Sequence, residues 1–195
     1  MKSVWDYKQD YDYVHLISSN DIPLMTKEYF KTFFNKELYL GFSPRNKEIY
    51  QRLAFYYPID HFNIRSHKMI LRFIKLINLT LHIDRLKDRN IIPEKGPNWF
   101  SIKNSFLPLI LSYKNMNIFK HSFLSDETYL QTILKDYRPE QLSEDNAMAA
   151  RYIDWKRGEP YVFTKKNVSE LKSVVDTKFA FARKVKDPNL VNEIF

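Results

Sequence analysis

The chain has 195 residues and a formal charge of +8, and 44% of its residues are hydrophobic. This composition predicts a single folded domain over residues 1–195, and the strands and helices expected along the chain make it α/β. The absence of cysteine excludes disulfide bonds, thiolate metal sites and cysteine nucleophiles. The positive charge suits nucleic acid, an anionic sugar nucleotide or the inner face of a membrane. Since the basic residues are dispersed and no nucleic-acid motif accompanies them, nucleic acid is not expected.

The first part of the chain predicts two strands and two helices. Residues 13–17 are apolar and β-branched, which predicts a buried strand that runs into an acidic turn at 18–21. Thr26 is predicted to cap a helix that continues to residue 36. A second strand is expected at 38–42, and a helix is expected at 45–57.

The middle of the chain contains its longest apolar stretch, residues 69–83. Apolar residues at helical spacing predict a long helix over 67–88, which we interpret as a core helix. Arg72, Lys75, Asn78 and His82 interrupt the stretch, so a transmembrane segment is not expected. Further on, the pattern predicts a strand at 99–102 and helices at 104–113 and 127–136. A strand at 151–155, a helix at 168–175 and a turn near 177–184 complete the prediction.

An acidic pair lies at the start of the predicted helix 127–136. In one interpretation, Ser125 caps the helix while Asp126 and Glu127 complement the positive end of its dipole. In the other, a carboxylate at this position serves as a catalytic base. The spacing alone leaves both interpretations open.

Residues 125–134 are the third of five unusual segments along the chain. The segments are 16–24, 96–101, 125–134, 151–155 and 181–184. In this order, the five segments resemble the core-2/I-branching β-1,6-N-acetylglucosaminyltransferases, which form glycosyltransferase family 14 with the peptide O-xylosyltransferases. The resemblance covers nearly the whole chain. It implies a GT-A fold that binds a UDP-sugar donor and transfers its sugar, of the N-acetylglucosamine or xylose type, to a glycan hydroxyl with inversion.

The resemblance also implies roles for charged residues. Glu127 aligns with the general base of the family, and Asp126, beside it, is predicted to bind the acceptor or its sugar. Lys184 matches a basic side chain that neutralises the leaving diphosphate in place of a metal, with Arg183 as its neighbour. Arg157 is a substitute for a second phosphate-binding arginine. Because basic side chains take the place of a metal in this family, no metal cofactor is expected. Without the resemblance, Lys184 would be interpreted as a solvated surface lysine.

Aromatic residues and glycines complete the predicted site. Trp155 aligns with a tryptophan that contacts the acceptor sugar. Trp99 is expected either to line the same cleft or to belong to the core. Asp21 could touch the donor sugar or the acceptor, or cap the following helix. Gly96 and Gly158 lie near these tryptophans, where they allow either a close approach of ligand or a tight turn.

Members of the family carry a further half-domain before the acidic turn, with the strands that cradle uridine and ribose. We therefore expect an N-terminally incomplete GT-A domain, whose other half is lost or is supplied by an upstream segment or a separate chain. A catalytically silent carbohydrate- or partner-binding remnant is the alternative. The expected location is the cytoplasm, including the inner face of the membrane, without a transmembrane segment or secretory leader.

Overall fold

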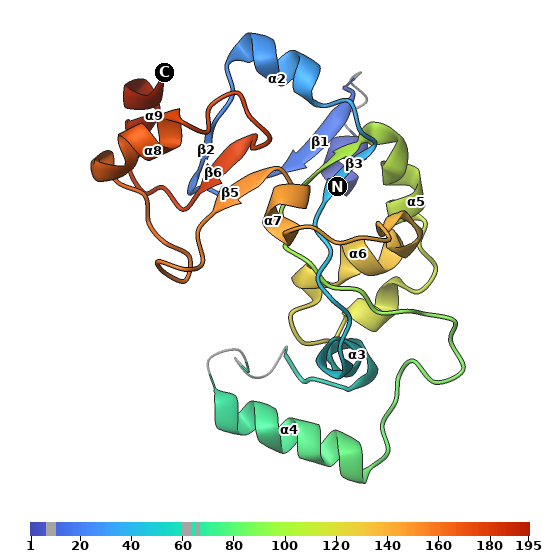
Figure 1. The fold of residues 1–195 in the computed structure, drawn as a ribbon. Coiled ribbons are helices and arrows are strands. Elements are labelled where there is room, and N and C mark those ends of the chain that lie inside the picture. Colours follow the sequence, from blue (N-terminus) through green and yellow to red (C-terminus); the bar gives the residue numbers. More distant parts are fainter. Residues whose placement is uncertain (7–10, 60–63, 65–66) are drawn as a thin grey trace. The chain divides into compact units, whose positions relative to one another are not determined.

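The computed structural model describes residues 1–6, 11–59, 64 and 67–195, and the chain divides into two compact units (Figure 1). Unit 1 comprises Met1–Tyr7, Phe42–Asn98 and Leu107–Glu140, and unit 2 comprises Lys8–Gly41, Trp99–Phe106 and Gln141–Phe195. The six strands found among the described residues all lie in unit 2. Helices and small sheets together confirm the mixed α/β class.

The strands of unit 2 form two three-stranded sheets. The first has the order β1-β4-β3 and is antiparallel throughout, with β1 at Tyr13–Leu16, β4 at Phe100–Lys103 and β3 at Leu38–Leu40. The predicted strands at 13–17, 38–42 and 99–102 are therefore confirmed. The expected burial of the first strand is wrong, because β1 is an outer strand of this sheet in the described part of the chain and Leu16 is exposed.

The second sheet has the order β2-β6-β5, with β2 at Asp21–Pro23, β6 at Phe181–Arg183 and β5 at Arg151–Ile153. Strand β6 is antiparallel to β2 and parallel to β5. The strand predicted at 151–155 is confirmed, whereas β6 replaces part of the turn predicted at 177–184. The middle position of β6 explains the difference, because its pairing comes from two distant segments and leaves little local signal.

Helices cover these sheets within unit 2. Helix α2 spans Lys27–Phe33 and begins at the predicted cap, since the Thr26 hydroxyl accepts a hydrogen bond from the Tyr29 N–H at 3.4 Å. Helices α7 (Asp145–Met148), α8 (Val168–Lys172) and α9 (Leu190–Ile194) follow later in the chain. A hydrophobic core joins β2 and β6 to α8 and α9; its buried residues are Ile22, Leu24, Phe163, Leu171, Ala182, Val185, Leu190 and Ile194.

The described part of unit 1 is helical. Its α-helices are α1 (Lys2–Asp6), α3 (Lys47–Ala54), α4 (Lys68–Thr80), α5 (Leu107–Leu111) and α6 (Tyr129–Ile133). Three 3-10 turns accompany them, η3 (Met116–Phe119), η4 (Ser125–Glu127) and η5 (Lys135–Tyr137). The predicted helix at 45–57 is shorter than expected, and the one at 104–113 is divided between a 3-10 turn, η2 (Asn104–Phe106), and α5.

The helix predicted at 127–136 is broken into η4, α6 and η5. Ser125 forms no side-chain cap, because the chain first makes the 3-10 turn η4 and α6 begins only at Tyr129. Four consecutive residues of α6, from Leu130 to Ile133, are buried. Helix α6 is therefore packed on several sides, with polar as well as apolar residues buried.

Helix α4 differs most from its prediction. It ends at Thr80, and within it only Ile74 and Asn78 are buried. The interpretation as a core helix is therefore wrong. A polar residue attaches α4 to the segment after α3. The Asn78 side chain accepts from the Tyr56 N–H at 2.7 Å and donates to the Tyr56 carbonyl at 3.0 Å. In the parts of the chain that are described, no helix combines the length and the hydropathy needed to cross a bilayer.

Candidate functional site

Glu127 lies at the end of η4 in unit 1, where two cations face its carboxylate. The Arg52 guanidinium, on α3, donates to Oε2 at 2.8 Å, and the Lys95 ammonium lies 3.7 Å from the same oxygen. The side chain of Glu127 is 26% exposed, so solvent still reaches it. The Glu127 carbonyl also accepts a hydrogen bond from the Gly96 N–H at 3.0 Å.

The polar contacts of unit 1 join two of the five sequence segments, 96–101 and 125–134. The Asn98 amide donates to the Asp126 carboxylate at 3.4 Å. The Gln131 amide donates to the Pro97 carbonyl at 2.8 Å. Asp126 itself is exposed. The acidic pair is thus held by its neighbouring segment, while both carboxylates keep contact with solvent.

A pocket of about 280 Å³ lies beside the cations that bind Glu127. Arg52 and Lys95 line it, together with Ser43 and Asn46. Glu94 precedes Lys95 in the sequence, and its fully buried carboxylate is paired with two arginines. These ion pairs hold this stretch of the chain in place. The Arg45 Nε and the Arg138 Nη1 each donate to this carboxylate at 2.6 Å. A carboxylate beside a pocket can accept a hydroxyl proton, and adjacent cations attract an anionic group.

Unit 2 brings three further segments into one sheet. In β6, Arg183 lies opposite Asp21 of β2 on one side and Ile153 of β5 on the other. The Arg183 Nη1 donates to the Asp21 carboxylate at 3.1 Å, and its guanidinium lies 4.1 Å from the centre of the Trp99 ring. Asp21, Trp99 and Arg183, all predicted site residues, are therefore neighbours.

The alternative role of Asp21 as a helix cap is wrong. Its second carboxylate oxygen accepts from the Ser18 N–H at 2.7 Å, which closes the acidic turn. Thr26, at the start of α2, is bound by Asp176 instead: one carboxylate oxygen accepts from its N–H at 2.7 Å and the other from its hydroxyl at 2.9 Å. Asp176 is far away in the sequence, so local pattern reasoning missed it.

Arg157 and Lys184, two of the three cations predicted to bind phosphate, differ in their surroundings. Arg157 is ion-paired with Asp154 and Glu170, and its guanidinium lies 4.3 Å from the centre of the Tyr161 ring. Hydrogen bonds with Glu170 and Asp154 raise the pKa of Arg157. The Lys184 ammonium makes no ion pair or side-chain hydrogen bond with any residue that the structure describes. Lys184 is therefore available to an anionic ligand, whereas Arg157 is already neutralised.

Trp155 lies in the loop after β5 and is 50% exposed. The Asp154 carboxylate shapes this loop by accepting from the N–H groups of Lys156 and Arg157 at 2.7 and 2.9 Å. An exposed indole face suits packing against the C–H groups of a sugar. Gly158 supports the tight-turn interpretation, because an added Cβ would lie 2.8 Å from the Tyr161 Cα.

Sequence reasoning assigned no role to Arg151, the first residue of β5, although its side chain is fully buried. Its guanidinium donates to the carbonyls of Ala149, Leu16 and Phe100 at 2.8, 3.2 and 3.1 Å. It also lies 4.5 Å from the centre of the Phe181 ring. Burial lowers the pKa of Arg151 to about 10, and the charge of Asp21 opposes this shift. Arg151 thus ties the ends of three strands together beside Asp21.

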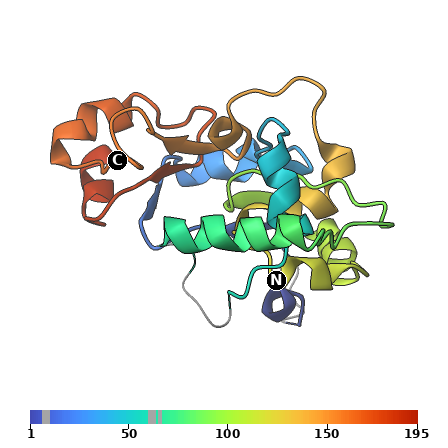
Figure 2. The same ribbon diagram turned by 90° about the horizontal axis from the view of Figure 1, so that it is seen from below.

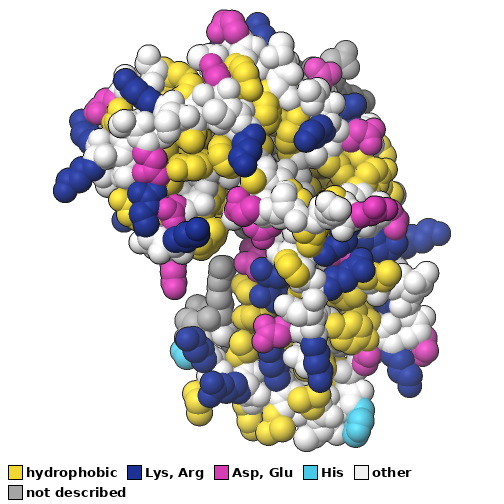
Figure 3. Space-filling model, in the orientation of Figure 1, with side chains coloured by type: hydrophobic (Ala, Val, Ile, Leu, Met, Phe, Trp, Pro, Cys, Tyr) yellow, Lys and Arg dark blue, Asp and Glu magenta, His cyan; other side chains and the backbone are white. Residues whose placement is uncertain are grey.

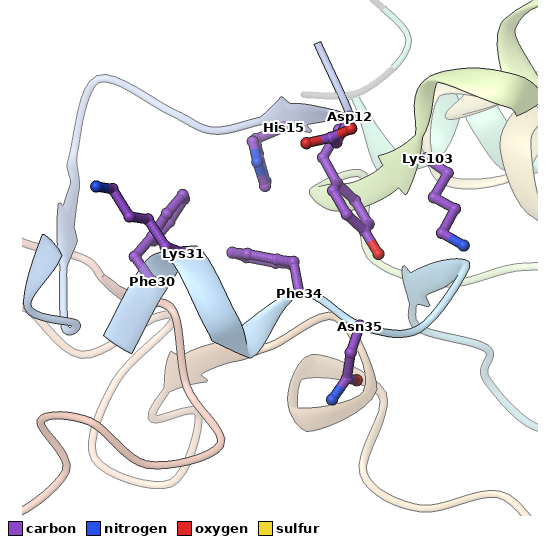
Figure 4. A pocket seen from close by; sticks show the side chains of 8 residues that line it. Asp12, His15, Phe30, Lys31, Phe34, Asn35 and Lys103 are labelled. Carbon is purple, nitrogen blue, oxygen red and sulfur yellow. The ribbon is translucent and has the colours of Figure 1, made fainter. Parts of the chain in front are cut away.

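A second pocket, of about 530 Å³, lies between α2 and the first sheet of unit 2 (Figure 4). The rings of His15, Phe30 and Phe34 converge in it, and Lys31 and Lys103 also line it. The His15 Nδ1 is 2.8 Å from the Ser101 hydroxyl. Burial, followed by the charge of Arg151, lowers the pKa of His15 to about 4. This pocket is not lined by any of the predicted site residues.

Glu127 and Asp126 belong to unit 1, whereas the other predicted site residues belong to unit 2. Their convergence around one crevice therefore stays a prediction. The partly exposed carboxylate of unit 1 and the unpaired ammonium of unit 2 are each typical of an enzyme that transfers a group from a phosphorylated donor.

Comparison with known families identifies the class of transferase to which the chain belongs. The family model described as Core-2/I-Branching enzyme matches residues 1–175, and the chain belongs to this family of glycosyltransferases. Such enzymes act on a sugar donor and an acceptor. No match was found among curated proteins.

Proposed function

We propose that the chain acts as an inverting glycosyltransferase that moves a sugar of the N-acetylglucosamine or xylose type from a UDP-sugar to a glycan hydroxyl. The family match over residues 1–175 is the observation that carries this proposal. Glu127 accepts the proton of the acceptor hydroxyl while its oxygen attacks the anomeric carbon. The bond from that carbon to the diphosphate breaks at the same time, and UDP leaves with the bonding electrons.

In this proposal, Lys184 takes the place of a metal ion by neutralising the charge that grows on the leaving diphosphate. Its unpaired ammonium supports this role. Arg183 is a weaker candidate, because Asp21 already accepts from its guanidinium. Arg157 is the weakest, because using it would require its two ion pairs to be broken. The exposed ring of Trp155 is the proposed platform for the acceptor sugar.

The proposal also extends to fold and location. In this proposal, the strand segments that carry Asp21 and Arg183 form part of the donor-binding edge of a GT-A domain. A transferase that uses cytoplasmic UDP-sugars would act in the cytoplasm or at the inner face of the membrane.

Replacement of Glu127 tests the proposed reaction. We expect Glu127→Gln to lower the rate of sugar transfer by about a thousandfold, because general base catalysis contributes on the order of 10²–10⁴. UDP binding, followed by calorimetry, should stay within about twofold, since the base contacts the acceptor rather than the nucleotide. Transfer is measured with radiolabelled UDP-sugars and a panel of glycan acceptors.

Asp136→Asn is the matched control, because it removes a carboxylate that is 79% exposed and has no predicted role in the site. This variant should keep most of the transfer activity. Full turnover by Glu127→Gln would remove Glu127 from the role of base. Binding of a glycan without any transfer by the unmodified chain would instead favour the silent carbohydrate-binding remnant.

A further inference from the structure

Helix α4 carries a row of large apolar side chains that face solvent. Met69, Phe73 and Leu76 are 76%, 63% and 56% exposed. Spacings of four and three residues place these side chains along one face of the helix. Ile70 and Ile77 widen the row on one side and are also exposed. An exposed apolar surface of this kind on a folded protein marks an interaction site.

A basic row runs along the same helix. Lys68, Arg72 and Lys75 each precede one residue of the apolar row, so the two rows are parallel and about 100° apart around the helix axis. The stretch from residue 67 to residue 83 contains no Asp or Glu. None of these three cations forms an ion pair with a residue in the described ranges.

Contacts on the buried side of α4 keep the apolar row and the basic row facing solvent. Ile74 and Asn78 lie on the opposite face, and Asn78 is fastened to the backbone of Tyr56 and to the Ile74 carbonyl. Figure 2 shows α4, in teal to green, along its whole length. In the lower part of Figure 3, hydrophobic and basic side chains lie next to one another. The exposed face is therefore fixed by native contacts of the opposite face.

We propose that α4 lies in the interface of an anionic lipid bilayer, with the row of Met69, Phe73 and Leu76 at the boundary of headgroups and acyl chains. The basic row then meets the anionic headgroups. Thirteen residues give a helix of about 20 Å, which suits a position in the plane of the interface rather than across the bilayer. A second copy of the chain fits this face less well, because two basic rows would be brought together.

Vesicle sedimentation with the full chain tests this assignment. We expect binding to phosphatidylcholine vesicles that contain phosphatidylglycerol, much weaker binding to pure phosphatidylcholine, and weaker binding at higher salt. Leu76→Ser should lower the partition coefficient by about tenfold, because it removes an apolar side chain from the row. Leu109→Ser is the matched control, since Leu109 on α5 is similarly exposed at 46%.

A paired charge experiment separates a local effect from the net charge. Arg72→Gln combined with Lys75→Gln should weaken binding by about 25-fold, at about fivefold for each cation. Lys27→Gln combined with Lys172→Gln lowers the charge equally at exposed positions of unit 2 and should have a smaller effect. Equal losses in the two pairs would overturn the assignment, as would equal binding to both kinds of vesicle. Self-association that Leu76→Ser abolishes, without vesicle binding, would assign the face to a second copy instead.

Discussion

Two buried charged side chains, Glu94 of unit 1 and Arg151 of unit 2, are stabilised in opposite ways. In unit 1, carboxylates lie between cations: Glu94 binds Arg45 and Arg138, and Glu127 lies against Arg52 and Lys95. In unit 2, buried Arg151 is held by backbone carbonyls and an aromatic ring.

This difference matters for the candidate site. In unit 1 the acidic candidate is oriented by its counterions, so its position depends on two cations that also line a pocket. In unit 2, Arg157 and Arg183 each pair with a carboxylate. Lys184 stays unpaired in the described part of the chain. Ion pairing therefore distinguishes positions that the sequence presents as equivalent cations.

The largest expected change in stability comes from Arg151, because its support does not depend on an opposite charge. Arg151→Met leaves three backbone carbonyls, two of them buried, without this donor and should lower the free energy of unfolding by about 3 kcal/mol. Denaturant titration measures this loss. Arg89→Met, at an exposed arginine, is the control and should change stability by no more than about 0.5 kcal/mol. A similar small change for Arg151→Met would show that the carbonyl contacts contribute little.

His15 should give unit 2 a pH dependence of its stability. Its pKa is lowered to about 4 by burial, so below pH 6.5 the unfolded state binds a proton that the folded state does not. The free energy of unfolding should therefore fall by about 2 kcal/mol between pH 6.5 and pH 4, with allowance for solvent screening. His15→Asn keeps a polar atom near the Ser101 hydroxyl but does not titrate in this range. An unchanged slope in this variant would assign the pH dependence to other groups.

A smaller effect is expected for the contact that holds α2. Asp176→Ala removes the acceptor for both the N–H and the hydroxyl of Thr26, and should lower the free energy of unfolding by about 1.5 kcal/mol. Thermal and denaturant unfolding measure the change. Asp136→Ala, at a carboxylate that is 79% exposed, is the matched control and should change stability little. Equal effects of the two variants would contradict the structural role of Asp176.

The sequence predicts those features that local chemistry determines. The Thr26 hydroxyl caps α2 through a residue three positions away, and β-branched residues give β1 and β4 a local signal. Strand β6 carries no such signal, because its place comes from pairing with β2 and β5. Periodicity identified the helix at α4 but could not tell which face meets the protein. Asn78, which appears as a polar interruption, is in fact the buried contact.

The candidate site shows the same limit. The sequence segments identify Glu127, Lys184 and Trp155 as candidates, but not the partners that orient or neutralise their neighbours. Arg52 and Lys95, which bind Glu127, come from parts of the chain that had no predicted role. Glu170, on α8, forms an ion pair with Arg157. Arg151 was missed because a charged residue is assigned to the surface by default.

Titration of the chain with UDP tests most directly the central claim, that Lys184 binds phosphate whereas Arg157 is neutralised by its ion pairs. Calorimetry should show an affinity that Lys184→Ala lowers by at least about tenfold, since a charge-assisted contact to phosphate is lost. Arg157→Ala should stay within about twofold of the unmodified chain, as should Lys186→Ala at an exposed neighbour. The reverse order, with Arg157→Ala losing the affinity and Lys184→Ala keeping it, would contradict the account, and so would the absence of UDP binding.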